Sequence, residues 1–564
     1  MAGFLDQAGD TVRLLEATPG WTRVLALLPD LDSETVAAVI GEAARTAERL
    51  VAPLNPPADR TGCRIEQGRV VTPPGFTEAY RRFAADGWLG LDIPASFGGQ
   101  DLPIALQAAV EPLFERACPA FMMAAGASRA AAHLIAETAD PAIAQDWVLR
   151  LVAGEWAATI CISEPGAGSD VGRIRTRARR EGRVWRIDGD KCWISFGDHD
   201  MASRIGHCLL ARTSDAPGTR GLSLFLVPDR RADGTANGVV LQRIEEKLGL
   251  HGSPTCVLGF DGSEATLLGE EGRGLPQLFT MIERMRLLTG CQGAGIAMGS
   301  LDVASRYAEE RRQGGAPDLE PAPILDHADV RRQILAMEAE TQILMAAVLE
   351  LGAEMDLARI EADETARAEN AAFAAWLMPM VKTFGAEAGF SVSSAAIQVL
   401  GGAGYTREFP VEQALRDARV LAVYEGTTGM QALDFLVRRL WREEGRGLSV
   451  FLKRAREEAG RAAITEAACA LRTLDAFAAL SREVADLAAT PRTGEAIADS
   501  YMRAAWIAVS AMMALRLVLA DAQTAAFAAI GRFRLHAIEE EMALMAARCR
   551  LTADEIDRRF SDGR

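Results

Sequence analysis

The sequence predicts an α+β protein in which a β domain stands between two helical blocks. Apolar residues recur every three or four positions over residues 1–157 and again from residue 273 onward, which is the period of helices that bury one face. Between these blocks, short runs that favour β-strands alternate with turn residues. The order is therefore helical, β, helical, and the β domain is expected to be antiparallel.

Changes in the hydrophobic pattern along the sequence divide the chain into four parts. At 564 residues it is too long for one ordinary core. We predict an N-terminal helical domain, a middle β domain, a C-terminal helical domain and an additional helical region, at residues 1–157, 158–272, 273–440 and 441–564. The last region either packs onto the core or its dimer, or takes the place of a second pair of subunits in a tetramer.

Local signals define the expected elements. Residues 32–54 form a helix with Ser33 as the candidate cap, and the proline-marked stretches 55–62 and 72–76 are expected to be loops. In the middle domain, Asp188-Gly189 joins two strand-like runs and is a hairpin signal. We also expect strands at 207–215, 221–229 and 254–262, a long helix at 275–312 and a loop at 314–326.

Composition limits the classes of function. With 61 basic and 77 acidic residues the net charge is −16, which disfavours a nucleic-acid or anionic-membrane binder. The nine cysteines show no C-x-x-C spacing, which is typical of reduced thiols in the cytoplasm. The six histidines lack metal-ligand spacing, so no metal site is expected. We expect neither a signal peptide nor a membrane span.

A glycine-rich stretch, CISEPGAGSDVG, occupies residues 161–172. Residues 165–169 form a tight loop in which glycine lets the main chain approach a ligand, so backbone N–H groups there could bind an oxygen-rich group. The stretch matches neither the dinucleotide fingerprint nor the P-loop, and by itself a plain turn is the simpler interpretation.

A second stretch, KCWISFGDHD, occupies residues 191–200. Trp193 and Ser195 alternate with Cys192 and Ile194, so the first two share one face of a strand. An indole and a hydroxyl on one face suit a flat ring with a polar edge, such as a flavin. Taken alone, the pattern is also explained by a core tryptophan beside a hydrogen-bonded serine.

The third stretch, residues 397–440, contains VYEGTTGMQ. Glycines at 401–404 end one helix, Pro410 can begin the next, and Thr427 or Thr428 can cap a third. Glu425 therefore lies in a short connection between helices. By itself it is interpreted as a solvated loop carboxylate, whereas a desolvated one would have a raised pKa and could act as a base. The pair Glu412 and Arg416 and an apolar face of Met430, Leu433, Val437 and Leu440 complete the expected helices.

Taken together and in this order, EPGAGSD, WIS, QVLGGAGY and YEGTTGMQ resemble the acyl-CoA dehydrogenase family over roughly residues 75–440. TPPGF, FGDHD, RGLSLFLVPD, EEKLGLHGSPTC, DHADVRRQIL and the extra C-terminal region are similar to the larger branch that includes 3-methylmercaptopropionyl-CoA dehydrogenase. The family fold comprises an N-terminal helical domain, a middle antiparallel β-barrel domain and a C-terminal helical bundle, in agreement with the helical, β, helical order.

The resemblance implies FAD as cofactor and an acyl-CoA thioester as substrate. In the family a glutamate removes the α-proton while a hydride leaves the β-carbon for flavin N5, which yields the trans-2-enoyl-CoA. Electrons then pass to an electron-transfer flavoprotein. A homo-oligomer is also implied, with a dimer favoured.

The resemblance further implies roles for individual residues. Glu425 matches the catalytic base, and Arg286 matches an arginine that binds the CoA portion. Tyr424 and Gly426 flank the base and are expected at the substrate, with Ser169. The residues that match FAD contacts, some of them across a subunit interface, are Ser163, Ser169, Trp193, Ser195, Arg311, Gln398, Gly402 and Thr427.

The chain departs from the family pattern at two positions. Gln313-Gly314 stand where smaller members carry an aromatic residue after an arginine pair, and Ser195 stands where threonine is common. The small residues and methionines of 121–135 suggest a roomy acyl pocket.

Two other functions stay open: an acyl-CoA oxidase that uses O₂, and a catalytically silent flavoprotein of the DNA-damage-response type. The net charge and the intact YEGT disfavour the second.

Overall fold

The computed structural model describes residues 3–182, 184–315, 318–462, 464–520, 525–551 and 553–561. The chain forms two compact units, both discontinuous in sequence. The first unit comprises Met1–Arg45, Pro103–Arg116 and Thr289–Arg564, and the second comprises Thr46–Leu102 and Ala117–Leu288.

The first unit is a helical bundle built on the long helices α10 (Ala328–Ile360) and α11 (Glu364–Leu400), which pack along one another. Asp363 begins α11 by accepting a hydrogen bond from the Ala366 N–H at 2.7 Å, and Gly401 ends it at φ +62°. The neighbouring helices are α1 (Phe4–Glu16), α2 (Pro19–Leu27), α3 (Ser33–Thr46), α6 (Ile104–Ala117), the later part of α9 (Gly274–Glu310), α12 (Val411–Ala418) and α13 (Thr428–Leu433).

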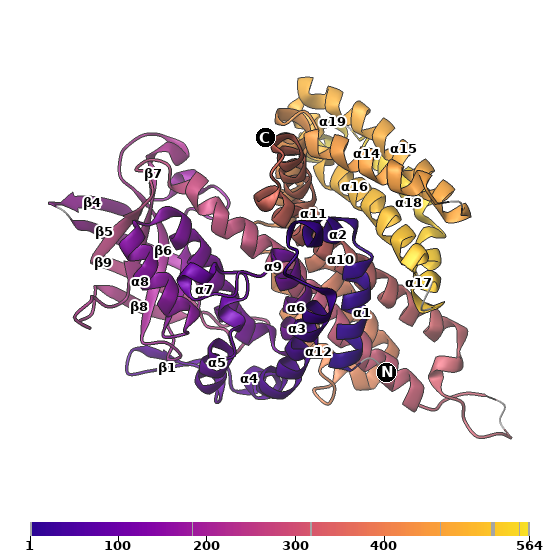
Figure 1. Cartoon of the computed structure of the whole chain (residues 1–564), viewed down its shortest axis with the longest axis horizontal. Helices are drawn as coiled ribbons and strands as arrows, with labels where there is room; N and C mark the ends of the chain where they lie inside the picture. Colours follow the sequence, from indigo (N-terminus) through magenta and orange to yellow (C-terminus); the bar gives the residue numbers. More distant parts are fainter. Residues whose placement is uncertain are drawn as a thin grey trace. The chain divides into compact units, whose positions relative to one another are not determined.

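The C-terminal region adds further helices to this unit, drawn in orange and yellow in Figure 1. They are α14 (Arg446–Gly460), α15 (Thr465–Asp486), α16 (Pro491–Leu519), α17 (Ala525–Leu535), α18 (Ile538–Arg548) and α19 (Ala553–Ser561). Phe451 of α14 stacks on Trp376 of α11 with ring centroids 4.9 Å apart, and Trp506 of α16 stacks on Phe384 at 4.8 Å. The extra region therefore covers α11 with aromatic contacts.

Buried ion pairs also join this region to α10. Arg516 of α16 lies 3.0 Å from the Glu350 carboxylate of α10 and 2.8 Å from that of Glu458, and Arg454 of α14 lies 2.8 Å from Glu354. Removing one partner of such a pair leaves an uncompensated buried charge. The carboxylates of α10 therefore depend on arginines that the extra region supplies.

Helix α16 is the one helix in the described part of the chain that is long and apolar enough to cross a membrane. However, 78% of its apolar window is buried inside the protein, and it packs against α13, α15, α17 and α18. Its apolar character is that of a core helix.

The second unit contains a seven-stranded sheet. Its strands are β3 (Trp156–Cys161), β4 (Arg177–Glu181), β5 (Val184–Ser195), β6 (Arg204–Arg212), β7 (Leu222–Pro228), β8 (Val239–Ile244) and β9 (Thr255–Leu268). Strands β6, β4, β5, β9 and β7 pair in that order, and β7 pairs back to β6, which closes a barrel. Most pairings are antiparallel as predicted, but β3 and β4 run parallel to β6.

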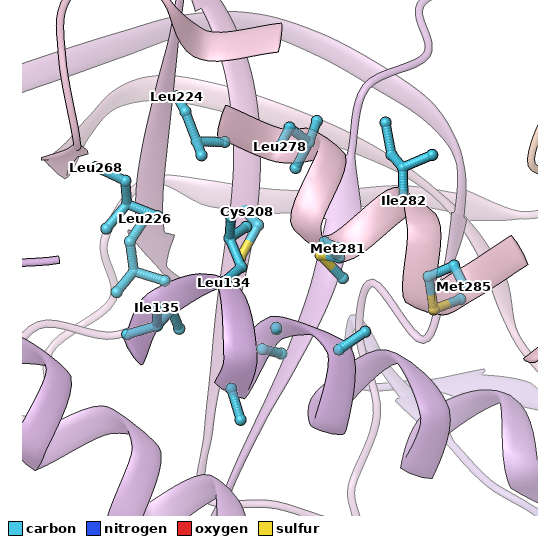
Figure 2. Packing of buried hydrophobic residues seen from close by; sticks show 14 of the residues in the cluster. Leu134, Ile135, Cys208, Leu224, Leu226, Leu268, Leu278, Met281, Ile282 and Met285 are labelled. Atoms are coloured by element: carbon cyan, nitrogen blue, oxygen red, sulfur yellow. The ribbon is translucent and has the colours of Figure 1, made fainter. Parts of the chain in front are cut away.

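Two helices pack on this barrel. Figure 2 shows Leu134 and Ile135 of α7 (Pro119–Thr138) in one cluster with Leu226 of β7 and Met281 and Met285 of α9. At Gly126 of α7 an added Cβ would lie 2.2 Å from Leu288 Cδ2 of α9, so a larger residue would require this leucine to move. The remaining elements of the unit are α4 (Asn55–Thr61), β1 (Arg64–Glu66), β2 (Arg69–Val71), α5 (Phe76–Ala85) and α8 (Pro141–Val152).

Strand β5 runs unbroken through Asp188-Gly189, so the predicted hairpin at this dipeptide is wrong. Gly189 has φ +145° and lies at a register shift in the pairing with β9. A Cβ there would lie 2.5 Å from Thr176 Oγ1, so the glycine serves a bulge in the barrel wall. The hairpin joins β4 to β5 instead, where Glu181 pairs with Val184.

Two expectations for residues 32–62 are also wrong. Asp32 caps α3 in place of Ser33, because its Oδ1 accepts the Thr35 N–H at 2.7 Å. The stretch 55–62 is mostly helix α4, with its prolines in the first turn, where the missing N–H groups would have had no helical partner.

The apolar face expected after Glu425 is only partly correct. Met430, in α13, is exposed. From Asp434 to Arg442 the chain forms a π-helix (η10), whose longer period turns Phe435 and Leu436 into the core. The general order of helical, β and helical regions with extra C-terminal helices is confirmed. The division at residues 157, 272 and 440 stays a prediction.

Two buried histidines predict that acid destabilises the second unit. His207 of β6 and His199 are both buried, and the His207 ring meets Phe260 edge-on at 5.8 Å. Burial lowers the pKa of His199 to about 4 and that of His207 to about 3. Because the unfolded chain protonates these side chains below about pH 6.5 and the folded chain does not, the free energy of unfolding should fall as the pH drops from about 6.5 toward 4.

The measurement is urea unfolding of the wild type and of His207→Gln at about pH 7 and about pH 5. The variant should lose less stability between the two pH values than the wild type. The exposed His536→Gln, in the other unit, serves as control and should behave as the wild type. Equal losses in all three proteins would contradict the assignment.

Candidate functional site

Glu425 lies in the connection between η9 (Arg419–Ala422) and α13, as the sequence predicted. Its φ is +54°, and that of Gly426 is +89°. The left-handed conformation is unfavourable for a residue with a side chain by about 1–2 kcal/mol, so neighbouring groups must hold Glu425 in it. The φ of Gly426 disfavours any residue with a side chain, and a Cβ there would also displace the Gln431 amide, whose Nε2 would lie 2.7 Å away.

Two buried side chains hold the connection. The ammonium of Lys382, fully buried on α11, donates to the Leu421 carbonyl at 2.8 Å and to the Gly426 carbonyl at 2.7 Å. Gln431 donates from Nε2 to the Glu425 carbonyl at 3.0 Å. Hydrogen bonds from a charged donor in a dry site are strong, so Lys382 fixes the chain on both sides of Glu425.

The ends of the neighbouring helices also follow the prediction. Thr427 caps α13 by accepting the Met430 N–H at 3.4 Å, and on α12 Arg416 bonds both carboxylate oxygens of Glu412, at 2.8 and 3.0 Å. The expected ion pair and one of the two candidate caps are therefore confirmed.

Tyr424, beside Glu425, turns its hydroxyl toward Gln292 of α9 and donates a hydrogen bond to its Oε1. Burial raises the pKa of Tyr424 well above its usual value, and the charges of Glu115 and Glu425 add to this effect. Tyr424 therefore stays neutral and remains a donor. Glu115, fully buried on α6, and Gln292 carry no sequence motif and were missed, because only the fold brings α6 and α9 to this loop.

Three other predicted residues of the first unit lie at helix ends. Arg311 follows α9 and is exposed, Gln398 is exposed in the last turn of α11, and Gly402 lies just beyond that helix. The ends of α9 and α11 share one hydrophobic cluster that includes Ala308 and Val399, so these residues lie at the same end of the unit. The side chains of Arg311 and Gln398 are exposed at this end.

In the second unit, Trp193 and Ser195 lie near the end of β5. Cys192 and Ile194 are buried, whereas Trp193 is 63% exposed and Ser195 is half-buried, so the predicted alternation is confirmed. Trp193 has φ +63° within a register shift of the pairing with β9, so a bulge turns the indole out of the barrel wall. The Ser195 carbonyl accepts the Thr159 hydroxyl at 2.7 Å.

The glycine-rich loop is held by a buried ion pair. Lys191 of β5, fully buried, donates from Nζ to the Ile162 carbonyl and to Glu164 Oε1, both at 2.9 Å. Glu164 also accepts the N–H groups of Arg175 at 2.7 Å and Thr176 at 3.0 Å. Burial opposes ionisation, but Lys191 and these hydrogen bonds hold the pKa of Glu164 below its usual value. The ion pair therefore fixes the loop to the strand that carries Trp193.

The structure brings Ser163 next to this strand but leaves Ser169 apart. The Ser163 carbonyl accepts the Cys192 N–H at 2.9 Å, one residue before Trp193, whereas Ser169 is exposed on the loop. Arg286, half-buried on α9, lies over the Phe279 ring with its guanidinium carbon 6.0 Å from the centroid. Arg286 lies far along the chain from the glycine-rich loop and from β5.

At several positions in these motifs, no steric contact within the chain explains why the residue is glycine. A Cβ on Gly166, Gly168 or Gly402 would meet nothing within 4 Å, and none of the three has a positive φ. Neither packing nor backbone conformation requires glycine at these positions. Open space beside the backbone and an exposed indole are what a flat cofactor with oxygen-rich groups needs.

A buried ionic cluster in the second unit was missed by the sequence. Asp92 accepts from Arg284 at 2.5 Å and contacts His133 Nε2 at 2.9 Å, while Arg129 lies 3.9 Å away. Burial opposes ionisation of Asp92, but His133 and the two arginines hold its pKa far below the usual range. These residues come from three separate segments, so no local spacing could indicate the cluster.

Comparison with known proteins establishes the family. Models described as the N-terminal, middle and C-terminal domains of acyl-CoA dehydrogenase match residues 33–155, 159–263 and 272–440. A curated relative, 3-methylmercaptopropionyl-CoA dehydrogenase of Ruegeria pomeroyi, is 38% identical over 453 residues, which are 78% of this chain and 76% of the relative. The chain belongs to the acyl-CoA dehydrogenase family.

Solved structures share the fold. A Caenorhabditis elegans protein, ACDH-11 in complex with C11-CoA, aligns with a TM-score of 0.77 at 22% identity, over 91% of this chain and 89% of that one. An acyl-CoA dehydrogenase from Bacillus anthracis complexed with FAD aligns with a TM-score of 0.71 at 22% identity, over 84% and 82%. The protein is thus an acyl-CoA dehydrogenase, a flavoprotein whose cofactor is FAD.

The two buried lysines predict local effects on two separate loops. Lys382→Met removes the donor of the Leu421 and Gly426 carbonyls, and hydrogen bonds to a charged group contribute about 1.5–3 kcal/mol each. Amides of residues 421–428 should exchange with solvent about tenfold faster or more, measured by hydrogen–deuterium exchange with mass spectrometry.

Lys191→Met is the matched control, since it removes an equally buried ammonium from the other unit. It should leave exchange at 421–428 unchanged and accelerate it at 162–176. If both variants accelerate exchange equally in both segments, the lysines stabilise the whole protein and do not restrain the loops individually.

Proposed function

We propose that Glu425 is the base that removes the α-proton of an acyl-CoA thioester and that the product is the trans-2-enoyl-CoA. The observation that supports this most directly is the strained loop around Glu425. A left-handed glutamate beside a glycine is held through buried hydrogen bonds from Lys382 and Gln431. Backbone strain maintained in this way is typical of functional positions.

The chemistry explains why the base needs such a restraint. An α-proton beside a thioester is weakly acidic, so the carboxylate must stand within hydrogen-bond distance of it and negative charge must be stabilised on the thioester oxygen. A displacement of the base by about 1 Å can lower the rate by about 10²-fold. Lys382 acts as a positioning residue, because it bonds main-chain carbonyls on both sides of Glu425.

The cofactor contacts are part of the proposal. FAD, when bound, accepts the hydride that leaves the β-carbon. Ser163, Ser169, Trp193 and Ser195 of the second unit offer an exposed indole, hydroxyl groups and a loop whose glycines leave space for a ligand. The proposed contacts from the first unit are Arg311, Gln398, Gly402 and Thr427. Arg286, Ser169, Tyr424 and Gly426 are the proposed contacts of the acyl-CoA.

Substrate and electron acceptor rest on similarity. The relative from Ruegeria pomeroyi suggests a short thioether such as 3-methylmercaptopropionyl-CoA, while medium or long acyl chains are the alternative. The proposed acceptor is an electron-transfer flavoprotein. An oxidase that uses O₂ is the second candidate, and a catalytically silent DNA-associated flavoprotein is disfavoured by the net charge of −16.

We also propose a cytoplasmic location. All nine cysteines lie in the described part of the chain and are free thiols. Seven of them are buried, and burial raises the pKa of Cys208 and Cys256 to about 12, so these thiols are unreactive. Unpaired cysteines are typical of a reducing compartment.

The first experiment is an anaerobic titration of the FAD-loaded enzyme with a panel of acyl-CoAs, for the wild type and Glu425→Gln. The visible absorption band of oxidised flavin reports reduction. The wild type should bleach with at least one thioester, and the variant should bind it and bleach about 10²–10⁴-fold more slowly, because a general base contributes that much.

Equal bleaching of both proteins would show that the base lies elsewhere. Re-exposing the reduced wild type to air in a stopped-flow instrument separates the two enzymatic candidates. Slow reoxidation favours the dehydrogenase, and rapid reoxidation favours the oxidase. If no thioester reduces bound flavin, the silent flavoprotein becomes the leading candidate.

The C-terminal helices support a homodimer. In this chain α14 and α16 cover α10 and α11 through the Trp376–Phe451 and Phe384–Trp506 stacks and through Arg516. A surface covered within the chain is not available to a second pair of subunits. Mass photometry should therefore show a dimer of a 60.5 kDa chain, and a tetramer would contradict the proposal.

A further inference from the structure

Tyr424, the residue directly before Glu425, is anchored in the first unit through its ring. The ring packs against a buried hydrophobic cluster that includes Ile296 of α9, Ala386 of α11 and Leu421 of η9. Displacing a large ring from such a cluster is unfavourable, because it exposes apolar surface to water. The side chain therefore ties the main chain at position 424 to several helices of the bundle.

The hydroxyl of Tyr424 lies against α9, in the part of that helix that belongs to the first unit. It donates a hydrogen bond to Gln292 Oε1, and Thr289, one turn earlier on the helix, also hydrogen-bonds it. Gln292 and Thr289 share one face of α9, and each is only 1% exposed. A rigid helix thus fixes the hydroxyl among buried side chains, where a hydrogen bond is stronger than in water.

This anchor restrains the loop from a direction that its other contacts do not supply. Lys382 holds main-chain carbonyls on both sides of Glu425 from α11, and Gln431 holds the Glu425 carbonyl from α13. Gln292 acts from α9, on the residue before the glutamate. Since Glu425 has φ +54°, restraints from several elements are needed to keep it in this unfavourable conformation.

We infer that Gln292 and the Tyr424 hydroxyl are positioning residues for the proton transfer and act through the main chain of Glu425. The inference rests on the proposed role of Glu425 as the base. Without its acceptor the buried hydroxyl would turn away, and the adjoining backbone would move with it. A displacement of the base by about 1 Å can lower the rate by about 10²-fold. The inference concerns the hydroxyl and is compatible with a contact between the Tyr424 ring and the acyl-CoA.

The test is anaerobic stopped-flow reduction of the FAD-loaded enzyme by 3-methylmercaptopropionyl-CoA, or by the acyl-CoA that reduces the wild type fastest. The variants are Gln292→Leu, which removes the acceptor, and Tyr424→Phe, which keeps the ring. Each should lower the rate of flavin reduction at saturating substrate about tenfold or more, while the substrate concentration at half-maximal rate changes less than about threefold. Such a split indicates that alignment is lost and binding is retained.

The double variant separates positioning from a loss of stability. A buried hydroxyl without an acceptor is destabilising, so Gln292→Leu should lower the Tm, and adding Tyr424→Phe should restore much of it. The rate of flavin reduction should nevertheless stay within about threefold of that of either single variant, because the two residues form one contact. Recovery of the rate together with the Tm would show that Gln292 only stabilises the fold.

Ser300→Ala is the matched control. Ser300 is buried on the same helix, about two turns beyond Gln292, and its hydroxyl hydrogen-bonds that of Ser393 at 2.8 Å. The control should reduce flavin at the wild-type rate. In hydrogen–deuterium exchange, residues 421–428 should exchange faster in Gln292→Leu than in the wild type, and at the wild-type rate in Ser300→Ala.

Three results would overturn the inference and leave the proposed base intact, provided that Glu425→Gln reduces flavin slowly. They are reduction at the wild-type rate in Gln292→Leu, recovery of the rate with the Tm in the double variant, and an equal loss of rate in Ser300→Ala. If Glu425→Gln is as fast as the wild type, or if no thioester reduces the wild type, the proposed base fails and this inference fails with it.

Discussion

One constraint applies in each of the two units: a buried ammonium must find acceptors. Lys382 finds them in the main chain around Glu425, and Lys191 finds them in Ile162 and Glu164 of the glycine-rich loop. Loops are ordinarily the mobile parts of a protein, whereas these two are bonded to side chains of helix α11 and strand β5. A dry, charged donor makes each loop part of the rigid scaffold, which a catalytic geometry needs.

Buried charges in the helical unit must likewise find partners of opposite charge. Glu350 and Glu354 place negative charge inside the bundle. Arg516 and Arg454 of the C-terminal helices pair with them, and Arg23 of α2 also pairs with Glu354. The extra region therefore belongs to the core. Since a buried pair is strongly destabilised when one partner is lost, truncation before α14 would expose both the aromatic stacks and these carboxylates.

Local sequence signals predicted the elements correctly where the tertiary contacts favour the same structure. The long helix α9, the cap of α13 and the ion pair of Glu412 and Arg416 depend on residues three or four positions apart, and all are confirmed. Asp188-Gly189 carries an equally strong local signal for a turn. There the pairing of β5 with β9 overrides it and converts the glycine into a bulge. The π-helix after Asp434 has no local signal and shifts the buried face by packing.

The sequence by itself determined the family, the order of helical and β regions, and the position of Glu425 between two helices. These follow from motifs and periods that lie close together along the chain. Only the tertiary structure decided which side chains surround that glutamate. Lys382, Gln292 and Glu115 come from α11, α9 and α6, and the cluster around Asp92 likewise joins three segments. Contacts between distant segments depend on how helices pack, and hydrophobic period alone does not specify that packing.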